Sequence, residues 1–479
     1  KHTRMCGIGG VYDPYGKAGE IAVKAAEELQ HRGQDGAGLF LNARDGPRVH
    51  KGAGFVHEVF HGMDIPSATI AISHVRYGTQ GASDKKGKNQ RNAAPLEIII
   101  EGEMRGAIAH NGDLVGAMPL LEAYQERRKT DVDTELFVLR FEDSNEKGLV
   151  NRVRDALMPV ANGAYSMVGI FDDALFAFRD PLGIRPLMYG KRMNGTCIIA
   201  SESQALEGCQ EIRDIGPGMM LILTAAGKSY EQIFATTRRA HCAFEHIYYS
   251  SPAAETDGIW DEGVRQHLGK IVAGYIDEKP DVIIPVPDSG NSFGMSLAYH
   301  LKVRPVPGLL RNHYMGRNFI VEGNRQELAR KKLRLNKKVF RGAHVLFADD
   351  SIVRGDTSKE LAGQAYDAGA RLVDIAVSYP LWSHLCNMGI NTHLHRELLG
   401  YRAEGSLKNA ASLVGVRRIY VPTALDVRRA MVATAAMNGI SRKESDFCMA
   451  CVDGIYPIHS PLMKAIPAKA EEYAGSRSV

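Results

Sequence analysis

Two buried-strand runs, each followed by a polar loop and a helix-like segment, constrain the fold of the C-terminal half. The first run is DVIIPVP (281–287), and the helix-like SFGMSLAYHL (292–301) follows it. The second is HVLFADD (344–350), followed by the loop SIVRGDTS, the helix-like KELAGQAYDAGA (359–370) and the strand-like RLVDIAVSY (371–379). Strand, loop, helix and strand in this order predict a doubly wound α/β unit with a parallel sheet.

The N-terminal half has a different pattern. Short β-branched and aromatic runs such as SATIAISHV, AYSMVGIFDD and TCIIAS alternate with turns, while EIAVKAAEELQ and DTELFVLRFED are typical of amphipathic helices. This mixture predicts an α+β domain of layered sheets. Because the periodicity fades near 230–240, we predict two domains, residues 6–235 and 236–479.

Composition argues against several classes of partner. The 59 Lys and Arg residues nearly balance the 55 Asp and Glu residues, and a net charge of +4 is too small to indicate nucleic acid or a membrane surface. No apolar run approaches the roughly 18 residues of a membrane span, and the N-terminus has no apolar secretory segment. The seven cysteines, an odd number, favour reduced thiols. We therefore expect a cytoplasmic enzyme.

The segment VLFADDSIVRGDTS (345–358) has the composition of an anion site. Gly355 allows close backbone approach, and Thr357 and Ser358 supply hydroxyl donors before a helix N-terminus. Asp349 and Asp350 suit sugar hydroxyls or a divalent cation. Two adjacent acids can also simply cap a helix, but the strand–loop–helix context favours a phosphate site.

This segment resembles the phosphoribosyl pyrophosphate (PRPP) signature of type I phosphoribosyltransferases, and DDSIVRG resembles the glutamine PRPP amidotransferase family in particular. VPDSGNSFG, RNHYMGRNFI, RKKLRLN and FEHIYYSSP fit the same family, as do CGIGGVYD, LQHRGQDGAG, ISHVRYGT, HNGDL, VDTE and RDPLGIRPL. The resemblance runs from about Cys6 to Pro457. It implies an N-terminal-nucleophile (αββα) glutaminase domain followed by a type I phosphoribosyltransferase domain with a parallel sheet.

The resemblance makes Cys6 the nucleophile that attacks the side-chain amide of glutamine. An N-terminal cysteine carries its own base, because an α-amine with a pKa of about 8 can accept the thiol proton. The resemblance implies Asn111 and the Gly112 N–H as oxyanion donors, Arg76 as the clamp for the α-carboxylate and Asp133 as the partner of the α-ammonium. This chemistry requires removal of KHTRM, and the sequence leaves that removal open.

The resemblance also implies the contacts of PRPP. We expect Asp349 and Asp350 to hold the ribose hydroxyls together with PRPP-bound Mg²⁺. Asp288 and Ser289 begin the pyrophosphate side, and Arg317 and Lys332 lie on a basic stretch that we expect to close over the pyrophosphate. The residues expected to cradle the 5-phosphate are Arg354, Gly355, Thr357 and Ser358.

The C-terminal CMAC segment contains a CxxC spacing, which alone is open to zinc, redox chemistry or neither. The resemblance to cluster-bearing members of the family implies a [4Fe–4S] cluster with a structural or oxygen-sensing role. A zinc site and free thiols are the alternatives. The four implied ligands are Cys242, Cys386, Cys448 and Cys451.

Several positions depart from the family pattern, notably Asp356 in the phosphate loop, Ser251 in place of an arginine and Gly290 in place of a hydroxyl. The resemblance implies glutamine-dependent amination of PRPP, giving 5-phosphoribosylamine, glutamate and pyrophosphate. The departures leave two alternatives. One is a paralogue that transfers ribose phosphate to another amine with an idle glutaminase, and the other is a non-catalytic PRPP or nucleotide sensor. Purine nucleotides are candidate inhibitors, and the resemblance suggests a dimer or tetramer.

Overall fold

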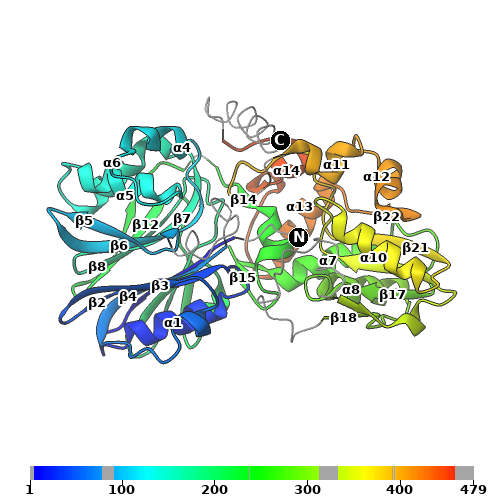
Figure 1. The fold of residues 1–479 in the computed structure, drawn as a ribbon, viewed down its shortest axis with the longest axis horizontal. Coiled ribbons are helices and arrows are strands. Elements are labelled where there is room, and N and C mark those ends of the chain that lie inside the picture. The colour runs from blue at the N-terminus through cyan, green and yellow to red at the C-terminus, as the bar shows by residue number, and fades with distance from the viewer. Residues whose placement is uncertain are drawn as a thin grey trace.

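The computed structural model describes residues 5–77, 91–236, 238–311, 333–390, 392 and 394–458. Two unlike halves lie side by side (Figure 1): a sandwich of two sheets formed by the N-terminal part of the chain, and a helix-flanked sheet formed by the C-terminal part. Within the described segments, no helix is long and apolar enough to cross a membrane.

The sandwich consists of two antiparallel sheets. Among the described residues, one sheet has seven strands in the order β11-β9-β10-β1-β4-β2-β3, and the other has six in the order β13-β12-β8-β7-β6-β5. The first contains β1 (Gly7–Tyr12), β2 (Gly36–Ala43), β3 (Gly46–Gly52), β4 (Ala68–Arg76), β9 (Met188–Lys191), β10 (Cys197–Ala200) and β11 (Glu211–Asp214). The second contains β5 (Leu96–Ile100), β6 (Glu103–Asp113), β7 (Ala164–Phe171), β8 (Ala174–Arg179), β12 (Met219–Thr224) and β13 (Gly227–Gln232).

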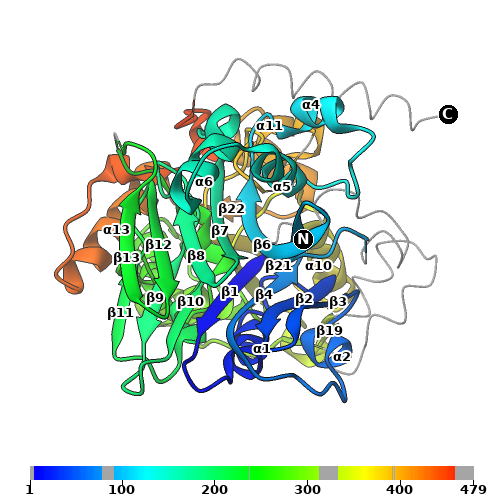
Figure 2. The ribbon, with the colours of Figure 1, turned by 90° about the vertical axis from the view of Figure 1, so that its left-hand side faces the viewer.

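Helices cover both outer faces of the sandwich (Figure 2). The helix α1 (Ala18–Glu28) packs its alanine-rich face on the first sheet, and α5 (Thr134–Asp143) with α6 (Leu149–Leu157) packs on the second. Between the sheets, residues such as Ile72 and Val168 form a separate buried layer. This αββα order confirms the expected fold of the N-terminal half. Its shorter helices are α2 (Val56–Val59), α4 (Ala117–Leu120), η1 (Leu121–Tyr124), η2 (Met158–Val160) and η3 (Ser203–Leu206).

The second half contains the expected parallel sheet, ordered β17-β20-β21-β22. Its strands are β17 (Val282–Pro285), β20 (His344–Asp349), β21 (Leu372–Val377) and β22 (Arg418–Tyr420). Alternate residues of β20 face opposite sides: Leu346 packs toward α7 (Asp261–Ala273), α8 (Asn291–Leu301) and α13 (Ala424–Met437), whereas Phe347 packs toward α10 (Asp356–Asp367) and α12 (Leu407–Val414). A strand buried on both faces explains why HVLFADD is almost continuously apolar.

Short elements complete this half. They are β14 (His241–Cys242), the π-helix η4 (Glu245–Tyr249), β15 (Glu255–Thr256), β16 (Ile259–Trp260), β18 (Leu309–Arg311), β19 (Leu333–Leu335), η6 (Lys337–Val339), η7 (His395–Glu397), α11 (Leu399–Arg402), η8 (Glu444–Asp446), β23 (Phe447–Cys448) and α14 (Ala450–Asp453). The strand β14 pairs in parallel with β23, so the segment that follows the sandwich is joined to the C-terminal segment. The predicted boundary at 235/236 stays a prediction; β13, the last strand of the sandwich sheets, ends at Gln232.

Candidate active sites

Cys6 lies immediately before β1 and is partly buried. Because β1 pairs antiparallel with β4 and Gly7 faces Val75, Cys6 lies beside the end of β4, where Arg76 is found. Its Sγ is 3.9 Å from the Tyr77 carbonyl oxygen. Burial raises the pKa of the Cys6 thiol, the charges of Arg76 and Arg32 oppose that rise, and the charge of Asp133 adds to it. The predicted nucleophile is therefore within electrostatic reach of the predicted clamp residues.

Asn111 and Gly112 lie at the end of β6. The Asn111 side chain is fully buried, and among the described residues neither its Nδ2 nor its Oδ1 has a hydrogen-bond partner. Gly112 has φ +140°, and a Cβ at this position would collide with the Ala164 carbonyl oxygen, so only glycine fits. A buried amide whose donor is unpaired among the described residues, next to a glycine backbone N–H, matches the donor pair expected for an oxyanion.

Asp133 ties the start of α5 to the turn after Gly112. Its Oδ1 accepts a hydrogen bond from the Thr134 N–H at 3.0 Å, and its Oδ2 accepts one from the Leu114 N–H at 2.7 Å. A carboxylate retains further lone pairs after accepting two such bonds. Arg76 is buried, which lowers the pKa of its guanidinium, although the nearby Cys6 partly offsets that effect. The five predicted glutaminase residues thus gather around the ends of β1, β4 and β6.

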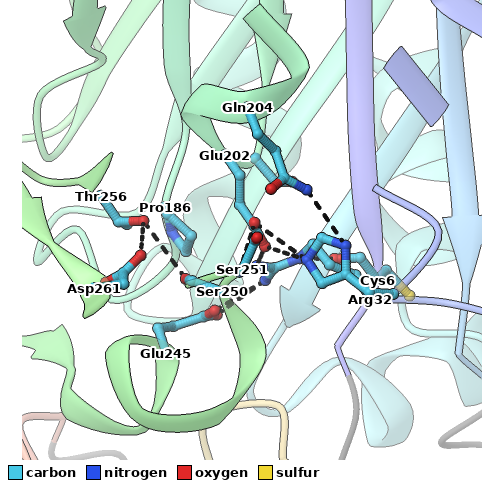
Figure 3. Close-up of polar contacts among 12 residues, drawn as sticks. Cys6, Arg32, Pro186, Glu202, Gln204, Glu245, Ser250, Ser251, Thr256 and Asp261 are labelled. Atoms are coloured by element: carbon cyan, nitrogen blue, oxygen red, sulfur yellow. Dashed lines mark hydrogen bonds and ion pairs between the residues drawn. The ribbon is translucent and has the colours of Figure 1, made fainter. Parts of the chain in front are cut away.

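The side chain of Arg32, from the LQHRGQ motif, holds the backbone of Cys6 (Figure 3), a role that the sequence does not predict. Its Nε donates to the Cys6 carbonyl oxygen at 3.0 Å, its Nη1 to Glu202 at 2.5 Å and its Nη2 to Glu245 at 3.0 Å. Although burial alone would raise it, the charges of His31 and Arg32 lower the pKa of Glu202 to about 2. The LQHRGQ motif is the sequence signal that marks Arg32. Its hydrogen-bond partners are distant in the sequence, so they are identified only in the folded chain.

Asp349 and Asp350 lie at the carboxyl end of β20, and both are buried. Ser289, which follows the adjacent strand β17, donates its hydroxyl to Asp350 Oδ1 at 2.8 Å, and Ser351 donates to Oδ2 at 2.8 Å. Two loops from neighbouring parallel strands therefore meet at one sheet edge, which is where ligands bind in open α/β sheets. The second half brings its predicted acids and Ser289 together.

The phosphate-cradling loop has the expected local form. Gly355, with φ +88°, precedes the first residue of α10, and Thr357 and Ser358 fall in the first turn of that helix, where backbone N–H groups favour an anion. Arg354 directs its Nε to Glu397 at 2.8 Å, so its guanidinium is engaged outside the loop. Asp356 is exposed at the helix N-terminus, where a carboxylate is favourable, so its charge faces solvent.

The other departures have local causes. A Cβ on Gly290 would lie 2.5 Å from the Ala348 carbonyl oxygen and 3.0 Å from the Asp349 Cα, so this backbone accepts no side chain. The Ser251 N–H donates to Glu202 at 3.0 Å, which fixes the segment at the junction of the two halves. Asp288 is exposed and forms an ion pair with Arg311. Arg317 and Lys332 lie outside the described residues.

The four cysteines of the predicted cluster lie in one buried region. Cys242 of β14 lies opposite Cys448 of β23, and the Tyr379 hydroxyl is 3.4 Å from the Cys451 Sγ. Burial, together with the charge of Cys242, raises the pKa of Cys448 to about 12, and similar causes raise that of Cys386 to about 11. All seven cysteines are free thiols. Among the residues that the structure describes, no three His, Cys, Asp or Glu side chains are grouped to hold one metal ion.

Comparisons with known proteins agree with this arrangement. Residues 88–208 match a glutamine amidotransferase domain family. The chain is 33% identical to an amidophosphoribosyltransferase of Bacillus subtilis, with 94% of each chain covered, and 33% identical to one of Pyrococcus horikoshii, with 94% of this chain and 96% of that protein covered.

Two solved structures share the whole fold. One, described as the allosteric regulatory enzyme of purine biosynthesis, superimposes with a TM-score of 0.87 at 30% identity over 97% of this chain and 99% of the other. The other, the glutamine PRPP amidotransferase of Bacillus subtilis complexed with ADP and GMP, gives 0.85 at 30% identity over 95% and 98%. The chain belongs to the amidophosphoribosyltransferase family.

Proposed function

We propose that this chain hydrolyses glutamine at Cys6 and transfers the ammonia to C1 of PRPP, giving 5-phosphoribosylamine, glutamate and pyrophosphate, as in the first step of purine synthesis. The observation that carries the proposal is that one chain contains two sites. One surrounds Cys6 in an αββα sandwich, and the other includes Asp349 and Asp350 at the edge of a parallel sheet. Family membership over nearly the whole chain supports the same reaction.

In the glutaminase half, the Cys6 thiolate attacks the side-chain carbonyl carbon of glutamine. The Asn111 Nδ2 and the Gly112 N–H stabilise the oxyanion, while Arg76 and Asp133 hold the α-carboxylate and α-ammonium. The proton taken from the thiol passes to the amide nitrogen, so ammonia leaves as the thioester forms, and water then hydrolyses the thioester to release glutamate and restore the thiol. Burial raises the pKa of the thiol, so a base is needed. We propose that the α-amine freed by cleavage after Met5 supplies it.

In the transferase half, the ammonia nitrogen attacks C1 of PRPP, and the C1–O bond to pyrophosphate breaks. Asp350, oriented by the hydroxyls of Ser289 and Ser351, is suited to the ribose hydroxyls. The first turn of α10, with Thr357 and Ser358, is suited to the 5-phosphate. Bound Mg²⁺, held by PRPP oxygens with Asp349 and Asp350, would neutralise the departing pyrophosphate.

The cysteines fit an iron–sulfur cluster better than a single zinc ion. Two of these thiols are buried and two are partly buried, and all four have raised pKa values, so they require a cationic partner before they ionise. A single zinc ion needs its ligands to converge on one point, which they do not do within the described residues. The corners of a [4Fe–4S] cluster each take one thiolate, so the ligands spread further apart. We therefore propose that Cys242, Cys386, Cys448 and Cys451 hold such a cluster, which anchors the C-terminal segment.

Further partners follow as proposals. A solved relative from Bacillus subtilis was complexed with ADP and GMP, so we propose that purine nucleotides bind and inhibit this chain too. We also propose that it assembles as a homo-oligomer, a dimer or tetramer.

The test uses the purified full chain with Mg²⁺, PRPP and either glutamine or ammonium. The proposal predicts glutamine-dependent release of pyrophosphate and glutamate, and ammonium should replace glutamine when Cys6 is changed to Ala. Pyrophosphate release with ammonium or another amine, but never with glutamine, would establish the paralogue with an idle glutaminase. Binding of PRPP without any pyrophosphate release would establish the sensor.

A further inference from the structure

A chain of buried ionic contacts crosses the junction between the two halves. It starts at the Cys6 carbonyl oxygen, which accepts from Arg32 Nε at 3.0 Å, and continues from Arg32 Nη2 to Glu245 at 3.0 Å. Arg185 Nη1 donates to the same carboxylate at 3.1 Å, and Arg185 Nη2 donates to the Met388 carbonyl oxygen. We call Arg32, Glu245 and Arg185 the junction relay. Their side chains are at most 2% exposed.

The relay ends on a loop that also touches the predicted oxyanion donor. Met388 and Gly389 lie in the loop after Cys386, one of the four clustered cysteines. A Cβ built on Gly389 would lie 3.1 Å from the Gly112 carbonyl carbon and 3.3 Å from Arg185 Nη2. The backbone of this loop therefore rests directly on Gly112. One loop of the second half thus reaches Cys6 through the relay and Gly112 by contact.

A terminal nucleophile has a particular need for such support. Once the preceding peptide is removed, only the carbonyl side of Cys6 restrains its backbone. A hydrogen bond to that carbonyl fixes the peptide plane and with it the direction of the Cα–Cβ bond. The thiol and the oxyanion donor must be held within a few tenths of an ångström of their productive geometry. A misplacement of about 1 Å can cost about 100-fold in rate.

We propose that Glu245 and Arg185 are positioning residues for glutamine hydrolysis. They hold Arg32, and through it the Cys6 carbonyl, in a fixed position relative to the loop that contacts Gly112. The inference rests on the proposed glutaminase reaction. According to this inference, glutamine hydrolysis in the first half depends on the position of the 386–390 loop of the second half. Neither residue contacts the Asp349–Asp350 site in any described hydrogen bond, so transfer of free ammonia does not depend on the relay.

The experiment compares full-length Glu245→Gln with the wild-type enzyme and with Glu207→Gln, a change at an exposed position of the first half. The glutamine variant keeps the shape of the side chain but removes the charge that pairs both arginines. We expect kcat for glutamine hydrolysis to fall about 10- to 100-fold. The KM for glutamine should change little, because Arg76 and Asp133 are untouched. Pyrophosphate release with ammonium should stay within about twofold of wild type, as should both activities of Glu207→Gln.

Removing a buried charge can also unfold a protein. Arg185→Lys keeps the charge but loses the two-pronged donation to Glu245 and Met388, and it should show the same selective loss of kcat. Equal losses of the glutamine and ammonium activities in the variant that folds would show that the relay only holds the fold, and would overturn the inference. Unchanged glutamine kcat in that variant would overturn it as well. A wild-type enzyme that hydrolyses no glutamine would instead overturn the proposed function.

Discussion

Replacing Asn111 by alanine separates the catalytic role of this residue from its structural one. The Asn111 side chain is 0% exposed and its amide has no hydrogen-bond partner among the described residues. An unpaired buried amide costs about 1–3 kcal/mol, and its removal leaves a small cavity with a cost of the opposite sign. The two effects roughly cancel, so we expect the free energy of unfolding to change by about 1 kcal/mol or less.

The transition state should respond very differently. If the Asn111 Nδ2 donates to the oxyanion formed at glutamine, its loss removes about 3–4 kcal/mol of stabilisation, a 100- to 1000-fold decrease in kcat. Glutamate release at saturating glutamine, with PRPP present, measures this decrease. Ammonium-dependent pyrophosphate release and the Tm report on the rest of the molecule and should be nearly unchanged.

Asn151→Ala, at an exposed position of α6, is the matched control and should leave all three measurements unaltered. The reasoning is refuted if Asn111→Ala hydrolyses glutamine within about tenfold of wild type. It is equally refuted if glutamine and ammonium activities decrease together with the Tm, because the residue would then be structural.

Three further predictions concern other parts of the molecule. Asp350→Asn should lower kcat/KM for PRPP by about 100-fold or more in the ammonium assay, because a neutral amide cannot balance the positive charge of Mg²⁺. Glutamine hydrolysis measured without PRPP should persist in this variant, and an equal loss of both activities would indicate unfolding. Burial and the charge of Arg76 lower the pKa of His74 to about 3, below the 6.5 of an unfolded histidine. The free energy of unfolding should therefore decrease by roughly 5 kcal/mol as the pH falls from about 6.5 to 3. In urea unfolding, the stability of His74→Gln should depend less on pH than that of His61→Gln, a control at an exposed position. Wild-type protein purified without oxygen should contain about four irons and acid-labile sulfide per chain, and Cys448→Ser should lose both; a content of about one zinc and no iron would contradict the cluster.

The fold and the acids of the transferase site were predictable from local pattern. The near-continuous apolar run before Asp349 required a strand buried on both faces, and the Gly355 loop required a helix directly after it. The glutaminase residues were identified only through the family motifs, because HNG or a lone arginine is by itself an ordinary turn or surface sequence. Their grouping depends on strand pairing, such as that of Gly7 with Val75.

The junction relay could not be predicted from the sequence. Arg32, Glu245 and Arg185 are charged residues, which usually lie on the surface. Along the chain, Glu245 lies 213 positions from Arg32 and 60 positions from Arg185. Each is buried only because the folded chain supplies an opposite charge. The close approach of the β20 backbone to Gly290, which the sequence does not show, gives a local reason for the glycine at that position.

The most direct test of the account measures glutamate and pyrophosphate together in one reaction of the purified chain with glutamine, Mg²⁺ and PRPP, on protein whose N-terminal residue has been determined. The account predicts equal amounts of glutamate and pyrophosphate from chains that begin at Cys6. Pyrophosphate without glutamate, or equal products from chains in which Cys6 is still preceded by Met5, would contradict it.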